Sequence, residues 1–241
     1  MRDEEVDKVL QKASGIAPQV EPAMLKHIAD SINSSLRPVR PLPPTWVLTG
    51  GMTLICAAVA VVAAACTGFF GIGKLGLWER VLIFATLGIL VWLAGREFVS
   101  QLIPGSRQYL SPGALLAIGC AALLGVFALV FRDYRTDHFI SAGVACLLTG
   151  LLLAIPAAFL SWLLLRRGFA VNPLAAGLAG GLLAGLSGVV MLELHCANFQ
   201  ALHVVVWHTA VLPLSAAAGA LVGLALRRNS SDDKIRREGQ S

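Results

Sequence analysis

The chain is poor in charged and aromatic residues: Asp, Glu, Lys and Arg make up 14% of its 241 residues, and Phe, Trp and Tyr make up 7%. A soluble domain of this size has about 25% charged residues. The net charge of +5 does not indicate nucleic acid, because the sequence has no basic stripe with interleaved aromatic residues. We therefore expect no direct binding of nucleic acid.

Sequence motifs of catalysis and nucleotide binding are missing as well. The sequence has no HExxH, GxSxG or GxxxxGK[ST] pattern, no GxGxxG after a predicted strand, and no CxxC among its five cysteines. The polar N-terminal segment contains no apolar core of a cleavable signal peptide. We expect neither an enzyme nor a bound cofactor.

Long apolar runs dominate instead: 56% of the residues are hydrophobic and the mean hydropathy is +0.75. A helix needs about 20 apolar residues to cross a bilayer. Six runs are long enough, so we predict an all-α polytopic membrane protein. The expected spans are Trp46–Phe70, Val81–Ile103, Pro112–Phe131, Phe139–Leu165, Pro173–Leu194 and Val204–Leu226.

The basic residues predict how the spans are oriented. Lys and Arg gather in the N-terminal segment, in the loops after the second and fourth spans, and in the C-terminal tail. The opposite side carries only Lys74, Arg80, Arg132 and Arg135. The positive-inside rule then places both termini in the cytoplasm. This gives a cytoplasmic head and linker (1–45), a membrane domain (46–226) and a cytoplasmic tail (227–241).

Two features inside the spans predict local packing. Arg96 and Glu97 interrupt the second span close to its end, where we expect both to extend towards the interface. Small residues recur at every fourth position in the last two spans, and such stripes let helix backbones approach closely. We therefore expect tight packing of Gly177, Gly181, Gly185, Ser215, Gly219 and Gly223 against neighbouring helices.

The head shows two short amphipathic patterns separated by Gly15 and Pro18 and followed by a proline-rich linker. Helices this short cannot bury their apolar faces alone. The faces could lie on the bilayer, fold back on the membrane domain, or bind a soluble protein. Basic and acidic residues balance here, which favours a protein partner. The expected binding face is Val6, Val9, Leu10, Met24, Leu25, Ile28 and Ile32.

A cluster of ionisable and aromatic residues lies between the fifth and sixth spans, on the predicted outward side. It comprises Glu193, His195, Cys196, His203, Trp207 and His208. Three interpretations remain open: a metal site built on histidine and cysteine, a disulfide between Cys196 and Cys66, and structural anchoring at the interface. Ionisable residues at a span are costly and usually have a function or a partner.

Several segments resemble the negative regulators of sigma F, a family of six-span anti-sigma factors. The likeness rests on the Gly- and Ala-rich run from Pro173 to Gly185, the His195-Cys196 pair that follows it, and Trp207. The turn at Arg166-Arg167-Gly168 and the linker from Ser35 to Pro43 are also similar. The chain departs where His208 follows Trp207 in place of Tyr, and where Ala197 follows Cys196 in place of a frequent Pro.

The resemblance implies a function. The head would bind an extracytoplasmic-function sigma factor at the bacterial inner membrane, and a signal at the outward cluster would release it. The alternative is a small transporter in which the head is only a cap. A third class, a membrane-embedded metalloenzyme using Glu193, His195 and His203, has less support because no catalytic motif is present.

Overall fold

A computed structural model describes residues 8, 22–35, 43–167, 170 and 172–238 of the chain. The protein forms two compact units, Met1–Leu42 and Pro43–Ser241. In the first unit, helix α2 (Pro22–Ser35) begins at a proline, which suits a first helical position because its missing N–H has no partner there anyway. The predicted face residues Val6, Val9 and Leu10 lie outside the described residues.

The predicted face of α2 is open on the described part of the helix. Met24, Leu25 and Ile28 are 57%, 54% and 46% exposed. Ile32 also lies in α2, but its side chain is outside the described residues. Helix α2 therefore presents three large apolar side chains that nothing in the described residues covers.

The second unit contains six helices that are long and apolar enough to span a membrane, which confirms the predicted all-α polytopic class. Their bounds lie within four residues of the predicted ones. The long helices are α3 (Thr45–Thr67), α4 (Leu77–Leu102), α5 (Pro112–Val130), α6 (Phe139–Arg167), α7 (Pro173–His195) and α9 (Thr209–Glu238). Between them lie the short helices η1 (Ile72–Lys74), α8 (Ala201–His203) and the π-helical turn η2 (Val204–His208).

Local sequence sets where several helices begin and end. The Ser111 hydroxyl accepts a hydrogen bond from Ala114 N–H at the start of α5, and the Asn172 side chain accepts one from Ala175 N–H at the start of α7. Helix α3 ends before its predicted limit because Gly68 adopts a positive φ of 106°, which a right-handed helix cannot continue, although the Gly68 N–H still bonds to the Ala64 carbonyl.

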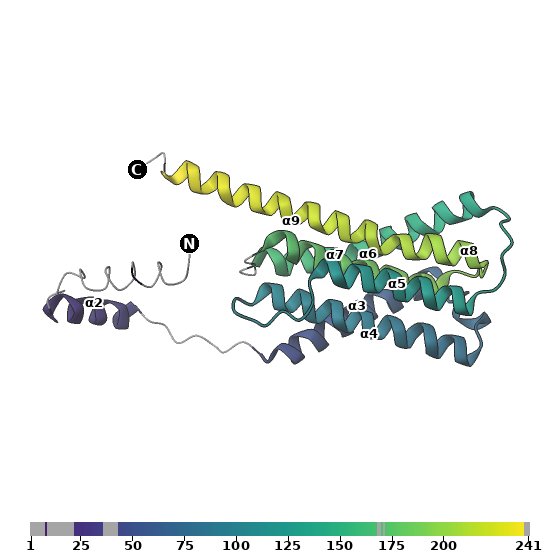
Figure 1. Cartoon of the computed structure of the whole chain (residues 1–241), viewed down its shortest axis with the longest axis horizontal. Coiled ribbons are helices and arrows are strands. Elements are labelled where there is room, and N and C mark those ends of the chain that lie inside the picture. The colour runs from purple at the N-terminus through teal and green to yellow at the C-terminus, as the bar shows by residue number, and fades with distance from the viewer. Residues whose placement is uncertain (1–7, 9–21, 36–42, 168–169, 171, 239–241) are drawn as a thin grey trace. The chain divides into compact units, whose positions relative to one another are not determined.

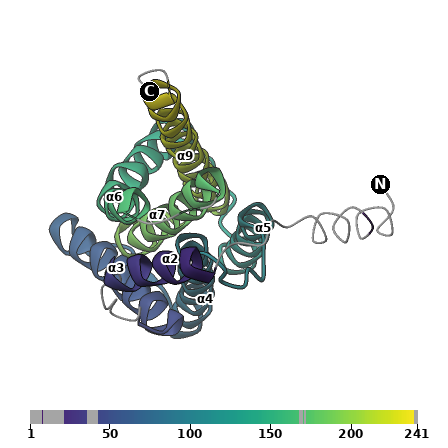
Figure 2. The same ribbon diagram turned by 90° about the vertical axis from the view of Figure 1, so that its left-hand side faces the viewer.

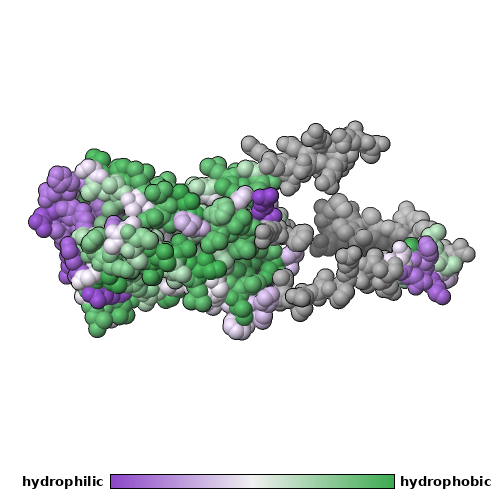
Figure 3. Space-filling model, turned by 180° about the vertical axis from the view of Figure 1, so that it is seen from behind, coloured by the Kyte–Doolittle hydropathy of each residue, from purple (hydrophilic) through white to green (hydrophobic). Residues whose placement is uncertain are grey.

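Helix α7 is the centre of the second unit. It packs against α3, α4, α5, α6 and α9. In the most apolar 18-residue stretch of α7, 78% is buried inside the protein, against 33% or less in the corresponding stretches of the other spans. Viewed along the bundle, α7 lies among its neighbours (Figure 2). On the face drawn in Figure 3, hydrophobic residues cover most of the second unit and hydrophilic ones gather towards its ends, as expected of a unit surrounded by lipid.

The small residues of α7 and α9 pack tightly, as their spacing predicted, and the structure shows that they pack on each other. A Cβ added at Gly181 would overlap the Ser215 carbonyl, and one added at Gly219 would overlap the Gly177 carbonyl. A Cβ at Gly223 would meet the Pro173 carbonyl in the same way. Two backbones therefore touch along this interface, an approach that only glycine permits.

The expectation for Arg96 and Glu97 is half wrong. Arg96 is exposed and its guanidinium lies 4.0 Å from the centre of the Tyr109 ring. Glu97 is buried, and its Oε1 accepts a hydrogen bond of 2.7 Å from Gln101 Nε2. Successive helical residues point about 100° apart, so Glu97 faces the bundle while Arg96 faces outward.

Candidate functional site: the end of the bundle around Cys196

The site forms where α7 stops and the chain turns back. Cys196 leaves the helix with an extended backbone, while its N–H still bonds to the Leu192 carbonyl at 2.7 Å. Residues 197–200 are not helical, and the chain re-enters the bundle at α8. Glu193 and Cys196 therefore lie on one arm of this turn, and His203 and His208 lie on the other.

A buried acid–base pair joins the two arms. Nδ1 of His208 lies 2.6 Å from Oε1 of Glu193, and both side chains are almost fully enclosed. Phe127 of α5 covers the His208 ring edge-on, with a ring separation of 6.4 Å. Each partner takes the place of water in the other's hydrogen bond, which offsets part of the cost of burying the two groups.

A second group of side chains meets beside this pair. Sγ of Cys196 lies 3.4 Å from Sγ of Cys146, which comes from α6, and 3.7 Å from Nε2 of His203. With His208 these three residues form a set, here called the Cys2His2 tetrad (Cys146, Cys196, His203 and His208). One potential ligand atom from each residue lies within 4.8 Å of all the others. The tetrad joins α6, the end of α7, α8 and η2.

The histidine rings of the tetrad carry buried nitrogens with no protein partner. His203 and His208 are 0% and 1% exposed. Among the described residues, neither Nδ1 of His203 nor Nε2 of His208 has a hydrogen-bond partner. Buried polar atoms without a partner are uncommon and need an explanation.

Two members of the sequence-predicted cluster face elsewhere. Nδ1 of His195 lies 3.0 Å from the Gly68 carbonyl oxygen, and the ring packs against Phe70. The Trp207 indole packs against Gly143, where a Cβ would overlap it. The expected cluster therefore divides: Glu193, Cys196, His203 and His208 meet in the structure, while His195 and Trp207 contact other residues.

The cysteine neighbours also differ from the expectation. Cys66 is exposed on α3, and the sulfur beside Cys196 belongs to Cys146, which the sequence analysis missed. Cys146 lies within an apolar run, where cysteine is an ordinary small hydrophobic residue. The one available signal was its depth: it lies seven residues beyond Phe139, about 10 Å from the predicted outward end of its span.

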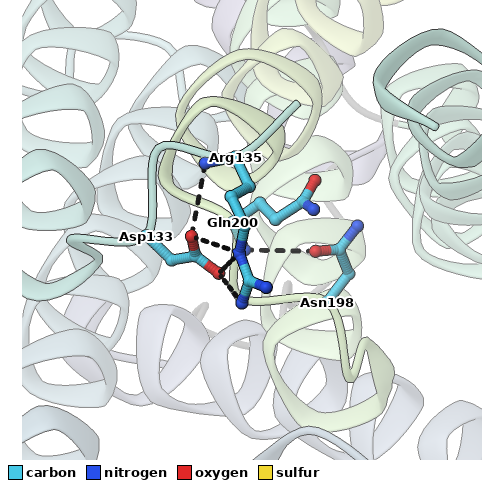
Figure 4. Close-up of polar contacts among 4 residues, drawn as sticks. All are labelled: Asp133, Arg135, Asn198 and Gln200. Atoms are coloured by element: carbon cyan, nitrogen blue, oxygen red, sulfur yellow. Dashed lines mark hydrogen bonds and ion pairs between the residues drawn. The ribbon is translucent and has the colours of Figure 1, made fainter. Parts of the chain in front are cut away.

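Loops at this end of the bundle hold the turn in place. Asp133, between α5 and α6, forms a parallel bridge with Gln200, and its carbonyl accepts a 2.6 Å hydrogen bond from Ala201 N–H. Arg135 pairs with the Asp133 carboxylate at 2.9 Å, and Gln200 N–H donates to Asn198 (Figure 4). The side-chain and backbone hydrogen bonds from Arg135 hold the pKa of Asp133 below its ordinary value.

A further loop, between α3 and η1, closes over the end of α7. Gly71 N–H donates to the Leu194 carbonyl at 3.1 Å. A Cβ at Gly71 would overlap the backbone carbonyls of Glu193 and Cys196, so a residue with a side chain could not lie this close. The connections after α3, α5 and α7 thus meet at one end, the end that the basic residues predict to face outward.

The six apolar helices and the cluster at one end define a polytopic α-helical membrane protein. A model of the family described as negative regulator of sigma F matches residues 33–228. The chain belongs to that family. Membership implies negative regulation of a sigma factor, and therefore a sigma factor as partner. No curated protein and no solved structure matches the chain.

The family model covers some of the features described above and leaves out others. It covers the proline-rich linker and all six spans, together with every residue of the Cys2His2 tetrad. It begins after Met24, Leu25 and Ile28, so the exposed face of α2 lies outside it. The family is regulatory, which suggests a protein without catalytic activity.

Proposed function

We propose that this protein is an anti-sigma factor of the bacterial inner membrane that sequesters an extracytoplasmic-function sigma factor through its N-terminal segment. The family match over residues 33–228 carries the proposal, because it implies negative regulation of a sigma factor. Both termini lie in the cytoplasm, where the sigma factor is, as the distribution of Lys and Arg favours.

The binding face is the apolar side of the head: Val6, Val9, Leu10, Met24, Leu25, Ile28 and Ile32. Support comes from α2, where Met24, Leu25 and Ile28 are exposed at positions that share one helix face. An amphipathic helix of this kind fits a hydrophobic groove on a soluble partner. The proline-rich linker keeps the bound sigma factor close to the membrane and away from RNA polymerase.

A signal at the outward end of the bundle releases the sigma factor. Glu193, Cys196, His203 and His208 are the candidates for this sensing region, with His195 and Trp207 beside them. Release requires the head to bind with different affinity in two states of the membrane domain. A hundredfold difference corresponds to only about 2.7 kcal/mol, a difference that a modest repacking of the spans can supply.

The test uses the full-length protein, purified in detergent after co-expression with each extracytoplasmic-function sigma factor of its host. Met24→Asp plus Ile28→Asp places two negative charges on the apolar face. Ala23→Asp plus Lys26→Gln changes the net charge by the same amount on the opposite face and serves as the control.

We expect one sigma factor to co-purify with the wild type and with the control, and to be lost from the Met24→Asp plus Ile28→Asp variant. Retention in that variant would show that the binding face is wrong. If no sigma factor co-purifies with the folded wild type, sequestration itself is wrong.

A further inference from the structure

We infer that the Cys2His2 tetrad binds one zinc-class metal ion, with Cys146, Cys196, His203 and His208 as ligands and Glu193 as the residue that positions His208. Two thiols and two imidazoles are one of the common ligand sets of structural zinc sites. The inference stands apart from sigma-factor binding, because none of these residues lies in the head.

The separations within the tetrad match a tetrahedral shell. Zn–S and Zn–N bonds of about 2.3 and 2.0–2.1 Å give ligand–ligand distances of about 3.4–3.8 Å in a tetrahedron. Cys146 and Cys196 sulfurs lie 3.4 Å apart, and Sγ of Cys196 lies 3.7 Å from Nε2 of His203. All four ligand atoms lie within 4.8 Å of one another. Small side-chain adjustments would complete the shell.

The contact between Glu193 and His208 is of the kind that supports a metal ligand. Metal-binding histidines usually bond their second nitrogen to a carboxylate, which fixes the ring and its tautomer. With Nδ1–H donating to Glu193, Nε2 of His208 carries the lone pair that a ligand requires. That nitrogen is buried and has no hydrogen-bond partner among the described residues.

The charges also fit a buried divalent cation. Two thiolates balance the two positive charges of the ion, so the ligand shell itself is neutral in a site that apolar residues such as Phe127 help to enclose. The Glu193 carboxylate beside His208 adds one negative charge next to the shell. The ion would connect α6, the end of α7 and the start of the last span. These elements come from distant parts of the sequence, so one ion would hold the outward end of three spans together.

A disulfide between Cys146 and Cys196 is the competing explanation of the short sulfur separation. A disulfide would involve only the two sulfurs and would not explain why His203 and His208 lie beside them. Nε2 of His208 would also remain buried without a partner, whereas a metal ion would bind it. The four-residue arrangement therefore favours the metal.

The test measures zinc in the full-length protein, purified in detergent through an affinity tag that contains no histidine. The protein is stripped with a chelator under reducing conditions, reconstituted with Zn²⁺, desalted and analysed by mass spectrometry for metal. Cys196→Ser and His203→Gln remove ligands. Cys66→Ser and Cys120→Ser remove cysteines outside the tetrad, and His195→Gln removes a histidine of the sequence cluster that faces Gly68.

We expect about one zinc per chain in the wild type and in the three control variants, following from a single four-ligand site. Cys196→Ser and His203→Gln should lose at least about nine tenths of it, because a structural shell needs all four ligands. Cobalt added to the stripped wild type should give the absorption bands of a tetrahedral thiolate complex, a readout that needs no variant to fold.

Three results would overturn the inference. The first is a folded wild type that takes up neither zinc nor cobalt. The second is zinc that persists in Cys196→Ser and His203→Gln. The third is a Cys146–Cys196 disulfide in the isolated, metal-free protein. This disulfide would block metal uptake until it was reduced, and after reduction it would form again even with metal present. Sigma-factor co-purification is a separate readout, so failure of either proposal leaves the other standing.

Discussion

Nδ1 of His208 lies 2.6 Å from Oε1 of Glu193, and both side chains are almost completely buried. The contact crosses from the end of α7 to the turn that opens the last span. Fifteen residues separate the partners in sequence, but helix α7 ends at Cys196 and the chain turns back, which brings His208 next to Glu193. The pair therefore fixes how the fifth and sixth spans meet.

Removing one member of this pair should destabilise the protein strongly. His208→Leu leaves the Glu193 carboxylate buried without its partner, and such changes cost about 3–5 kcal/mol. The double variant Glu193→Leu plus His208→Leu should cost less than the sum of the two single changes. The free energy of unfolding of the wild type, the two single variants and the double variant is measured with SDS in mixed micelles. Chelator is present throughout so that metal plays no part. Additive costs would show that the two groups act independently.

Adding a single methyl group at the α7–α9 interface should lower the stability of the protein. Gly181→Ala drives a Cβ into the backbone around Ser215, and overpacking of this kind costs about 1–3 kcal/mol. Gly125→Ala in α5 is the matched control, because a Cβ there meets nothing within 4 Å. The same SDS unfolding measurement compares them. Equal stability of the two variants would contradict the close approach of α7 and α9.

Topology follows from the predicted orientation and is checked with fusions. Alkaline phosphatase joined after Tyr134 should be active, because that loop is predicted to face outward, and phosphatase joined after Arg107 or Ser241 should be inactive. A fluorescent protein that matures only in the cytoplasm should give the opposite pattern. The reverse result at all three sites would invert the membrane domain and place the head outside.

The exposed pair between Asp133 and Arg135 predicts a pH dependence. The hydrogen bonds from Arg135 lower the Asp133 pKa, so the carboxylate should titrate below the ordinary value of about 3.9. What the pair contributes to stability is present above the unfolded pKa and is lost as the pH falls through the folded one. Carbon-13 NMR of labelled aspartate in the full-length protein follows this titration, and Arg135→Gln should raise the midpoint towards the ordinary value, because only the backbone hydrogen bond to Asp133 remains. An unchanged midpoint in that variant would contradict the assigned cause.

Hydropathy and residue spacing predicted much of the fold. Run length predicted the six spans, and small residues at every fourth position predicted that α7 and α9 pack tightly against neighbouring helices. Only the structure shows that these two helices contact each other. The burial of Glu97 was missed. Its position near a span end favoured the interface, whereas the side of the helix on which it lies decided the outcome.

The site was only partly accessible from sequence. Glu193, Cys196, His203 and His208 attracted attention because they are close in the chain, and His195 and Trp207 were included for the same reason. Cys146 is fifty residues away from Cys196, and which helices are neighbours is not encoded in hydropathy. The role of the whole cluster stays a prediction until metal content and sigma-factor release are measured.

The central position of α7 has a consequence for how the protein is made. Membrane proteins are synthesised from the N-terminus onward, so α3, α4, α5 and α6 are made before the helix against which all four pack. Those four can form their own neighbour contacts, but the middle of the bundle stays unfilled until the fifth span enters. Assembly of this protein is therefore completed late, and a chain truncated before Pro173 would lack the element around which the rest is arranged.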